Sequence, residues 1–255
     1  LTELSTGTFT STGIDDNATS TAITINASEN VGIGTVPKTW QSQSNALEIG
    51  ELSIEDYEIS GSNATNILFN GYRDTDNSFK RKVDGYSVRV GSYLGDFAVQ
   101  LYGNGSADEV LTGSPAMRID SSGNLLVGKT ATSYLTDGFE ATQDGLVRIT
   151  RNNLPTTVFN RRGSDGAISE FYKDGSTVGS IGTENGFLSI GHDDVNLNFR
   201  DDASIPRVIP RTGAGGSSDG VISFGDAGSR FKDLYLSGGV VFGDAGGSGS
   251  STSNT

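Results

Sequence analysis

Short stretches of this chain alternate between hydrophobic and polar residues, and turn-forming pairs separate one stretch from the next. Val195, Leu197 and Phe199 alternate with polar residues, which predicts a β-strand with one buried face. Runs rich in β-branched and aromatic residues predict four earlier strands of a meander, at residues 157–160, 167–173, 177–181 and 187–190. Asp174-Gly175 and Asn185-Gly186 separate these runs, and such pairs favour hairpins because both residues accept positive φ.

Helical periodicity is weak by comparison. No stretch of ten or more residues combines apolar residues at helical spacing with freedom from glycine. Two short helical turns are expected, at residues 53–57 and 229–234. The pattern therefore predicts an all-β protein built of small modules, namely hairpins and meanders.

An imperfect internal repeat joins residues 23–34 (ITINASENVGIG) and residues 117–128 (MRIDSSGNLLVG). Both copies predict a strand, a tight polar turn, a second strand and then glycine. Repetition of one supersecondary unit is typical of chains in which each unit buries its face on its neighbours.

Composition shifts divide the chain into five segments. The first two are an N-terminal repeat with a linker (1–45) and a β module with an aromatic insert and the second repeat (46–130). The other three are a hairpin meander (131–204), a connector with a distal strand cluster (205–243) and a Gly/Ser-rich tail (244–255), whose composition is that of a flexible linker.

Charge and composition exclude several kinds of function. The chain has 18 Lys and Arg against 31 Asp and Glu, a net charge of −13, which argues against binding nucleic acid. It has no Cys and a single histidine, His192, so neither a thiol nucleophile nor a His-rich metal centre is expected. No apolar run approaches the ~18 residues of a membrane helix. We expect no cofactor, no metal and no membrane insertion.

Residues 123–130 (GNLLVGKT) match the phosphate-binding pattern G-x4-G-K-T. That loop must follow a strand and open a helix, so that backbone N–H groups face the phosphate. Here residues 125–127 are themselves a predicted strand and no helix follows. We therefore reject a nucleotide site.

Three other patterns contain residue types that occur in catalytic or metal sites. His192 with Asp193 and Asp194 indicates a solvated turn, because no nucleophile elbow exists in the chain. Residues 74–78 begin like a calcium loop but lack its Gly and its later Glu, so a turn is expected. A glycosidase-type carboxylate pair stays open; its candidates are Glu48, Glu51, Glu55, Asp56 and Glu58, or Asp193, Asp194, Asp201 and Asp202.

Aromatic residues are concentrated in the module 46–130. An exposed Tyr beside Asp or Asn suits stacking on a sugar ring, although most of these aromatic residues are expected in strand core or a subunit interface. The candidate receptor-binding residues are Tyr72, Phe79, Tyr86, Tyr93 and Tyr102.

Three phrases carry a family resemblance. Residues 30–35 (NVGIGT), with Pro37 and then ALEI at 46–49, form the first, and residues 117–128 are its second form. The third is RFKDLYLSGGV at 230–240. Together they resemble phrases that recur in bacteriophage tail-fibre and tail-spike proteins, a type often followed by a self-cleaving C-terminal chaperone.

The resemblance implies an elongated homotrimeric fibre on a virion, with β-sandwich or β-prism-like and β-helix-like segments. Its partners would be two further copies, other virion tail proteins and a glycan or protein of the host surface; the virion is extracellular after release. Gly32, Gly34 and Gly128 would lie where backbones approach closely at the trimer axis.

The expected function is therefore a non-enzymatic structural subunit that also recognises a receptor. A polysaccharide-degrading tail spike is one alternative, and a bacterial trimeric adhesin or a phage head fibre is another.

Overall fold

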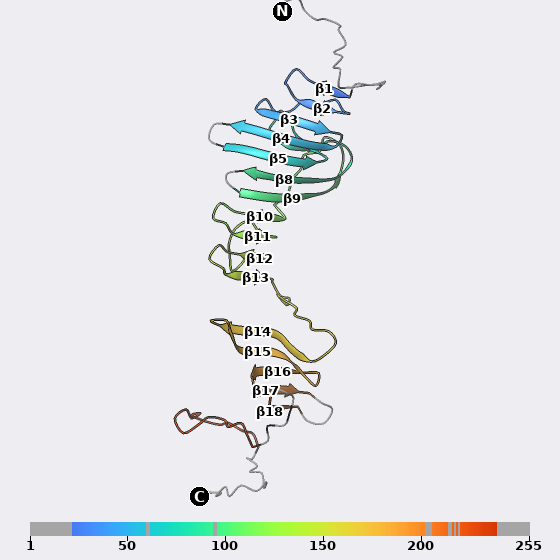
Figure 1. The fold of residues 1–255 in the computed structure, drawn as a ribbon. Helices are drawn as coiled ribbons and strands as arrows, with labels where there is room; N and C mark the ends of the chain where they lie inside the picture. The colour runs from blue at the N-terminus through green and yellow to red at the C-terminus, as the bar shows by residue number, and fades with distance from the viewer. Residues whose placement is uncertain are drawn as a thin grey trace, which may run out of the picture. The chain divides into compact units, whose positions relative to one another are not determined.

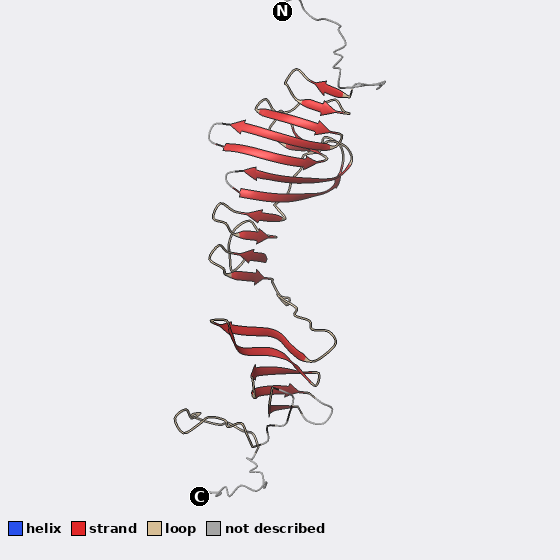
Figure 2. Ribbon diagram, viewed as in Figure 1, coloured by secondary structure: helices blue, strands red, loops and turns tan. Residues whose placement is uncertain are grey.

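The computed structural model describes residues 22–59, 62–93, 96–201, 206–213, 216, 218 and 220–238, without the side chains of residues 59, 62, 63 and 93. Every regular element in this part of the chain is a strand, which confirms the all-β prediction (Figures 1 and 2). The chain forms two compact units, Leu1–Val158 and Phe159–Thr255. The predicted meander segment 131–204 thus contributes to both units.

Unit 1 is built on one eleven-stranded sheet, in the order β1-β2-β3-β4-β5-β8-β9-β10-β11-β12-β13. Its neighbours pair antiparallel except β2 and β3, which run parallel. The strands are β1 (Ile23–Ile25), β2 (Val31–Ile33), β3 (Ser44–Ile49), β4 (Leu52–Ile59), β5 (Ser62–Phe69), β8 (Gly85–Tyr93), β9 (Asp96–Gly105), β10 (Met117–Ile119), β11 (Leu125–Val127), β12 (Gly138–Ala141) and β13 (Val147–Thr150).

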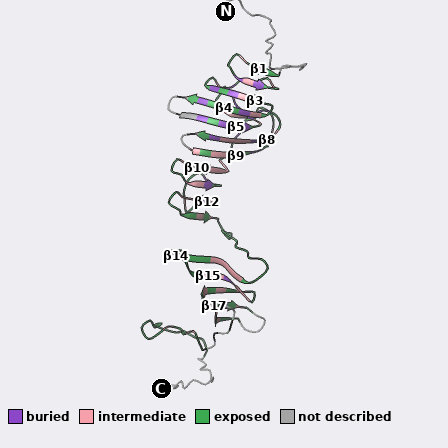
Figure 3. Ribbon diagram, in the orientation of Figure 1, coloured by how far each residue is buried: buried purple, intermediate pink, exposed green. Residues whose placement is uncertain are grey.

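A small hairpin, β6 (Gly71–Arg73) with β7 (Phe79–Arg81), covers part of this sheet. Tyr72 from the hairpin packs with Trp40, Ala46 and Leu68 to form the buried apolar cluster, and Phe79 packs against it. The hairpin and the linker that carries Trp40 thus give the central strands one covered face. Figure 3 shows the resulting alternation of buried and exposed positions along β3 and β4.

The two copies of the repeat fold alike, as predicted. They form the hairpins β1–β2 and β10–β11. Asn26 and Asp120 open the turns, and each side-chain Oδ1 accepts backbone N–H groups two and four residues later, at 2.9–3.0 Å. The side chains of Asn30 and Asn124, which close the turns, each accept a backbone N–H from a neighbouring segment.

Unit 2 contains a five-stranded antiparallel meander in chain order. Its strands are β14 (Gly166–Lys173), β15 (Ser176–Glu184), β16 (Phe187–His192), β17 (Val195–Arg200) and β18 (Arg207–Arg211). The predicted strands at 167–173, 177–181 and 187–190 are confirmed. The predicted strand at 157–160 is wrong: those residues pair with no other strand, and a strand without a partner has no ladder to stabilise it.

Both predicted helical turns are wrong. Residues 53–57 lie within β4, where Ser53, Glu55 and Tyr57 are buried at alternate positions. Two of these inward residues are polar, so the sequence does not show the alternation of hydrophobic and polar residues that is typical of a strand. Residues 229–234 form no helix either; Asp226 N–H donates to Ser229 O at 3.1 Å in an irregular turn.

Candidate functional site

The covered face of the unit 1 sheet holds three fully buried glutamates. Glu48 on β3 accepts hydrogen bonds at Oε1 from Lys38 N–H (2.8 Å) and Trp40 Nε1–H (2.6 Å), and it forms an ion pair with Lys82. These contacts attach the linker after the first repeat to the sheet. A buried carboxylate must be matched in this way, because an uncompensated charge in the interior is very costly.

Glu55 on β4 is the second buried glutamate. Its Oε1 accepts hydrogen bonds from Ser44 Oγ–H (2.7 Å) and Arg73 Nε–H (2.6 Å), and Asn66 Nδ2 donates to its Oε2 at 2.7 Å. The guanidinium carbon of Arg73 lies 4.1 Å from the ring centres of both Tyr57 and Phe79. This network clamps the β6–β7 hairpin onto the sheet.

Glu140 on β12 is the third. It pairs with Lys129 (Nζ to Oε2, 2.6 Å) and with Arg148, and Ser133 N–H donates to it at 3.0 Å. Burial by itself raises the pKa of Glu140, but the hydrogen bonds from Lys129, Ser133 and Arg148 outweigh burial and leave the pKa lowered.

The internal repeat could have indicated the positions of two of these glutamates. Gly32 and Leu126 occupy the same position in the two copies, and each lies opposite a buried glutamate, Glu48 and Glu140 respectively. Of the other acids weighed as a carboxylate pair, Asp56 and Glu58 are exposed at alternate positions of β4. The other two candidates of this group on β3 and β4, Glu48 and Glu55, are each paired with a cation of the same chain, Lys82 and Arg73 respectively.

The five aromatic candidates separate by burial. Tyr72 and Tyr102 are buried, and Tyr72 donates its hydroxyl to Asp108 Oδ1 at 2.8 Å; burial, followed by that bond, raises the pKa of Tyr72. Phe79 is half-buried beneath Arg73 and Arg89. The Tyr93 side chain lies outside the described residues.

Tyr86 differs from the other four because its side chain is 74% exposed. It lies in the register irregularity between Gly85 and Ser87, where β8 pairs with β9. Two residues of β9, Gly103 and Asn104, lie opposite Tyr86 there, so the extra residue belongs to β9 and Tyr86 lies on the same face of β8 as Val88. Contact between Tyr86 and a receptor stays a prediction.

The local backbone conformation explains why each of the three predicted axis positions is a glycine. Gly34 and Gly128 each follow a repeat hairpin with positive φ, 64° and 71°, and donate N–H to Ala22 O and Ala116 O. Gly32 meets its own chain: a Cβ there would lie 2.3 Å from Thr35 O and 2.8 Å from Pro37 Cδ. Their placement at a trimer axis stays a prediction.

The other candidate motifs lie in turns or in the interior. Residues 74–78 form the β6–β7 turn, as expected, and Lys80 Nζ pairs with Asp74 and Asp76. Lys129 of the GNLLVGKT segment is buried against Glu140 and Ser133 O. His192 is half-exposed, and its Nε2 lies 3.5 Å from Asp193. Within the described residues, no three His, Cys, Asp or Glu side chains are grouped as a metal site would require.

The open face of the unit 1 sheet carries an uninterrupted line of apolar side chains, here called the apolar row. Each member lies directly opposite the next across the sheet, one from every strand, and none of them is buried. The apolar row consists of Ile25, Val31, Leu47, Ile54, Ile67, Val90, Val99, Met117, Val127, Phe139 and Ile149.

Other apolar residues flank the row on the same face. Phe69 pairs with Val88, and Val88 pairs with Leu101, whose side chain is 61% exposed. Unit 1 is therefore polar at many of its buried positions and apolar on its open face. Folding of one chain leaves this apolar surface in water.

The unit 2 sheet shows the same division. Ile181, Ile190 and Leu197 lie opposite one another on one face, whereas Ser189 pairs with Gly182 and Asn198 on the other. Val195, Leu197 and Phe199 were expected to be buried, but all three are exposed and Asn198 is the buried residue of their strand. That expectation is wrong, because Asn198 on the opposite face is enclosed by hydrogen bonds with Leu188 O and Arg200 of the same sheet.

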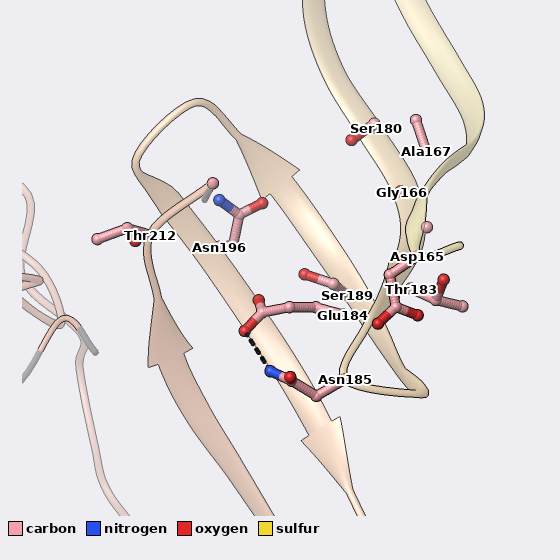
Figure 4. A pocket seen from close by; sticks show the side chains of 12 residues that line it. Asp165, Gly166, Ala167, Ser180, Thr183, Glu184, Asn185, Ser189, Asn196 and Thr212 are labelled. Atoms are coloured by element: carbon pink, nitrogen blue, oxygen red, sulfur yellow. Dashed lines mark hydrogen bonds between the residues drawn. The ribbon is translucent and has the colours of Figure 1, made fainter. Parts of the chain in front are cut away.

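A polar pocket of about 390 Å³ lies in unit 2 (Figure 4). Its lining comes from the start of β14, the second half of β15, single residues of β16 and β17, and the two residues after β18. Its lining residues are Asp165, Gly166, Ala167, Ser180, Gly182, Thr183, Glu184, Asn185, Ser189, Asn196, Thr212 and Gly213.

No family model, curated protein or solved structure matches the chain. A search of the described residues for a helix with the length and apolar character needed to cross a membrane finds none.

Proposed function

We propose that this protein is a structural subunit of a bacteriophage fibre or spike, which assembles as a homotrimer and presents a surface to a host receptor. The apolar row is the observation that carries the proposal. Monomeric proteins seldom expose contiguous apolar patches larger than a few hundred Å². With strands about 4.8 Å apart, a row that crosses eleven strands extends for about 48 Å.

A second and a third copy of the chain are the proposed occupants of this face. Each copy would supply the same row, so the surfaces match in length and in chemistry. Apolar burial contributes about 25 cal/mol for each Å² removed from water, so joining three such faces offsets the cost of association. The number three follows from the resemblance of the repeat phrases to tail-fibre proteins.

Assembly through the open face would leave the turns at the periphery. Tyr86 lies near the start of β8, at the margin of that face, and is the exposed aromatic candidate proposed to contact a receptor. Other tail proteins would be the partners on the particle, and the virion would be the location of the protein.

The interface is tested by placing one charge within it. Ile67→Glu changes a half-exposed member of the apolar row, and Ser28→Glu adds the same charge in the exposed β1–β2 turn. Sedimentation velocity of both variants should show dissociation for Ile67→Glu alone. Equal mass for the two variants, with both folded by circular dichroism, would remove the apolar row from the proposal.

A further inference from the structure

The polar pocket of unit 2 is distinguished by the chemistry of its lining. Hydroxyl groups come from Ser180, Ser189 and Thr212, and amides come from Asn185 and Asn196. Ala167 is the apolar side chain in the lining. A volume of about 390 Å³ falls in the lower part of the roughly 300–1,000 Å³ range of small-molecule sites.

Several of these groups are held in place by the fold. Asn196 Nδ2 donates to Asp193 O at 2.7 Å, which orients the amide. Glu184 Oε1 accepts from Arg211 Nε–H at 2.6 Å and from Asn185 Nδ2 at 3.3 Å, the bond drawn in Figure 4. Both oxygens of Asp165 lie 3.3 Å from Gly186 N. A site with groups fixed in advance loses less entropy when it binds a ligand.

The charges of the pocket exclude some kinds of ligand. Asp165 and Glu184 are the charged side chains of the lining, and Glu184 is paired with Arg211, so the lining itself offers no cation to a phosphate or a carboxylate ligand. The pocket is also a poor metal site. Among the described residues, no third His, Cys, Asp or Glu side chain joins these two acids. A lining of this polarity also gives an apolar molecule little to contact.

From this lining we infer that the pocket binds a neutral saccharide. Each sugar hydroxyl both donates and accepts hydrogen bonds, so it can donate to Asp165 or Glu184 and accept from Asn185. The inference rests on the receptor-recognising part of the proposed function, and it names the ligand class and the place of binding. Ser180 and Ser189 would lie beneath the ring.

The pocket also stays accessible if the apolar faces associate. Ser189 and Asn196 point to the face of the sheet opposite Ile190 and Leu197, because neighbouring residues of a strand alternate between faces. Burial of the apolar face against other copies would leave the polar face in contact with solvent.

The test is isothermal titration of the full chain with maltotriose, laminaritriose and triacetylchitotriose, with trigalacturonic acid as the anionic counterpart. Saturable binding of at least one neutral trisaccharide is expected, and the anionic one should not bind. Ser189→Leu fills the pocket and should weaken binding by about tenfold or more, the effect of losing one or two hydrogen bonds together with their space. Ser176→Leu, at the exposed start of β15, is the matched control.

Ser189→Ala removes the hydroxyl with little change of shape, so it keeps the test valid if the leucine variant unfolds. Saturation by none of the neutral trisaccharides, or unchanged affinity in both Ser189 variants, would overturn the saccharide site. Light scattering on the same samples separates the two proposals. A trimer that binds no sugar refutes the pocket alone, and a monomer that binds sugar at Ser189 refutes the trimer alone.

Discussion

Lys129 and Glu140 form an ion pair in which neither side chain reaches solvent, with Nζ and Oε2 separated by 2.6 Å. Lys129 also donates to Ser133 O at 2.7 Å, so the pair ties the loop between β11 and β12 to the sheet. The same covered face carries the Glu48–Lys82 and Glu55–Arg73 pairs. Unit 1 thus places charged groups in its interior, and each of them is matched by an opposite charge.

Removing one partner of the pair should destabilise unit 1 strongly. Lys129→Met leaves the Glu140 carboxylate buried with Arg148 as its remaining cation and removes the hydrogen bond from Lys129 Nζ, so the loss should be several-fold larger than that from an exposed pair. Urea unfolding followed by circular dichroism measures the change. Lys173→Met is the matched control, because Lys173 and Asp174 are 77% and 84% exposed and such pairs contribute about 0–1 kcal/mol. Equal losses in the two variants would contradict the burial argument.

Glu140 should also make stability depend on acid pH. Its pKa in the folded chain lies below the ordinary value of 4.5, so the unfolded chain binds more protons in the acid range. The stabilisation is complete above pH 4.5 and is lost as the pH falls through the lower, folded pKa. Urea titrations of the native protein and of Glu140→Gln, from pH 7 to pH 3, should show their difference in unfolding free energy shrinking below pH 4.5. A difference that stays constant with pH would show that Glu140 does not contribute to the pH dependence of stability.

The repeat turns depend on their first side chain. Asp120→Ala removes the acceptor for Ser122 N–H and Asn124 N–H, and two lost hydrogen bonds correspond to about 1–3 kcal/mol. Thermal unfolding should register the loss. Ser122→Ala, in the same turn, keeps both bonds because its backbone N–H is the donor, and it should melt close to the native protein.

Replacing a glycine that closes a repeat should lower the stability of the protein. Gly128 has a φ of 71°, so Gly128→Ala forces a strained backbone at a cost of about 1 kcal/mol. Gly103→Ala is the control, since a Cβ there meets nothing within 4 Å and its φ is not positive. A loss of stability in Gly128→Ala at unchanged oligomer mass would assign this glycine to the turn. A loss of mass would favour its place at a trimer axis.

The local chemistry of turns was predictable from the sequence. Asn26 and Asp120 open their turns with side-chain hydrogen bonds, and Gly34 and Gly128 follow with positive φ. Each of these preferences belongs to one residue and its near neighbours, so the repeat could be recognised without knowing what it packs against.

Which face of each strand is covered could not be predicted in the same way. Hydrophobic alternation in Val195, Leu197 and Phe199 indicated the strand, but the residue enclosed within the chain is Asn198. In β4, Glu55 is enclosed while Ile54 is half-exposed. Burial depends on segments distant in the sequence, such as the one that carries Arg73, and on any surface that other chains cover.

The mass of the protein in solution, measured by light scattering, tests the proposed trimer most directly. One chain has a mass of 26.6 kDa. We predict a particle of three times that mass, which Ile67→Glu converts to single chains and Ser28→Glu leaves intact. A native protein that stays at the mass of one chain across the concentration range, and binds no hydrophobic dye on the apolar row, would contradict the proposal.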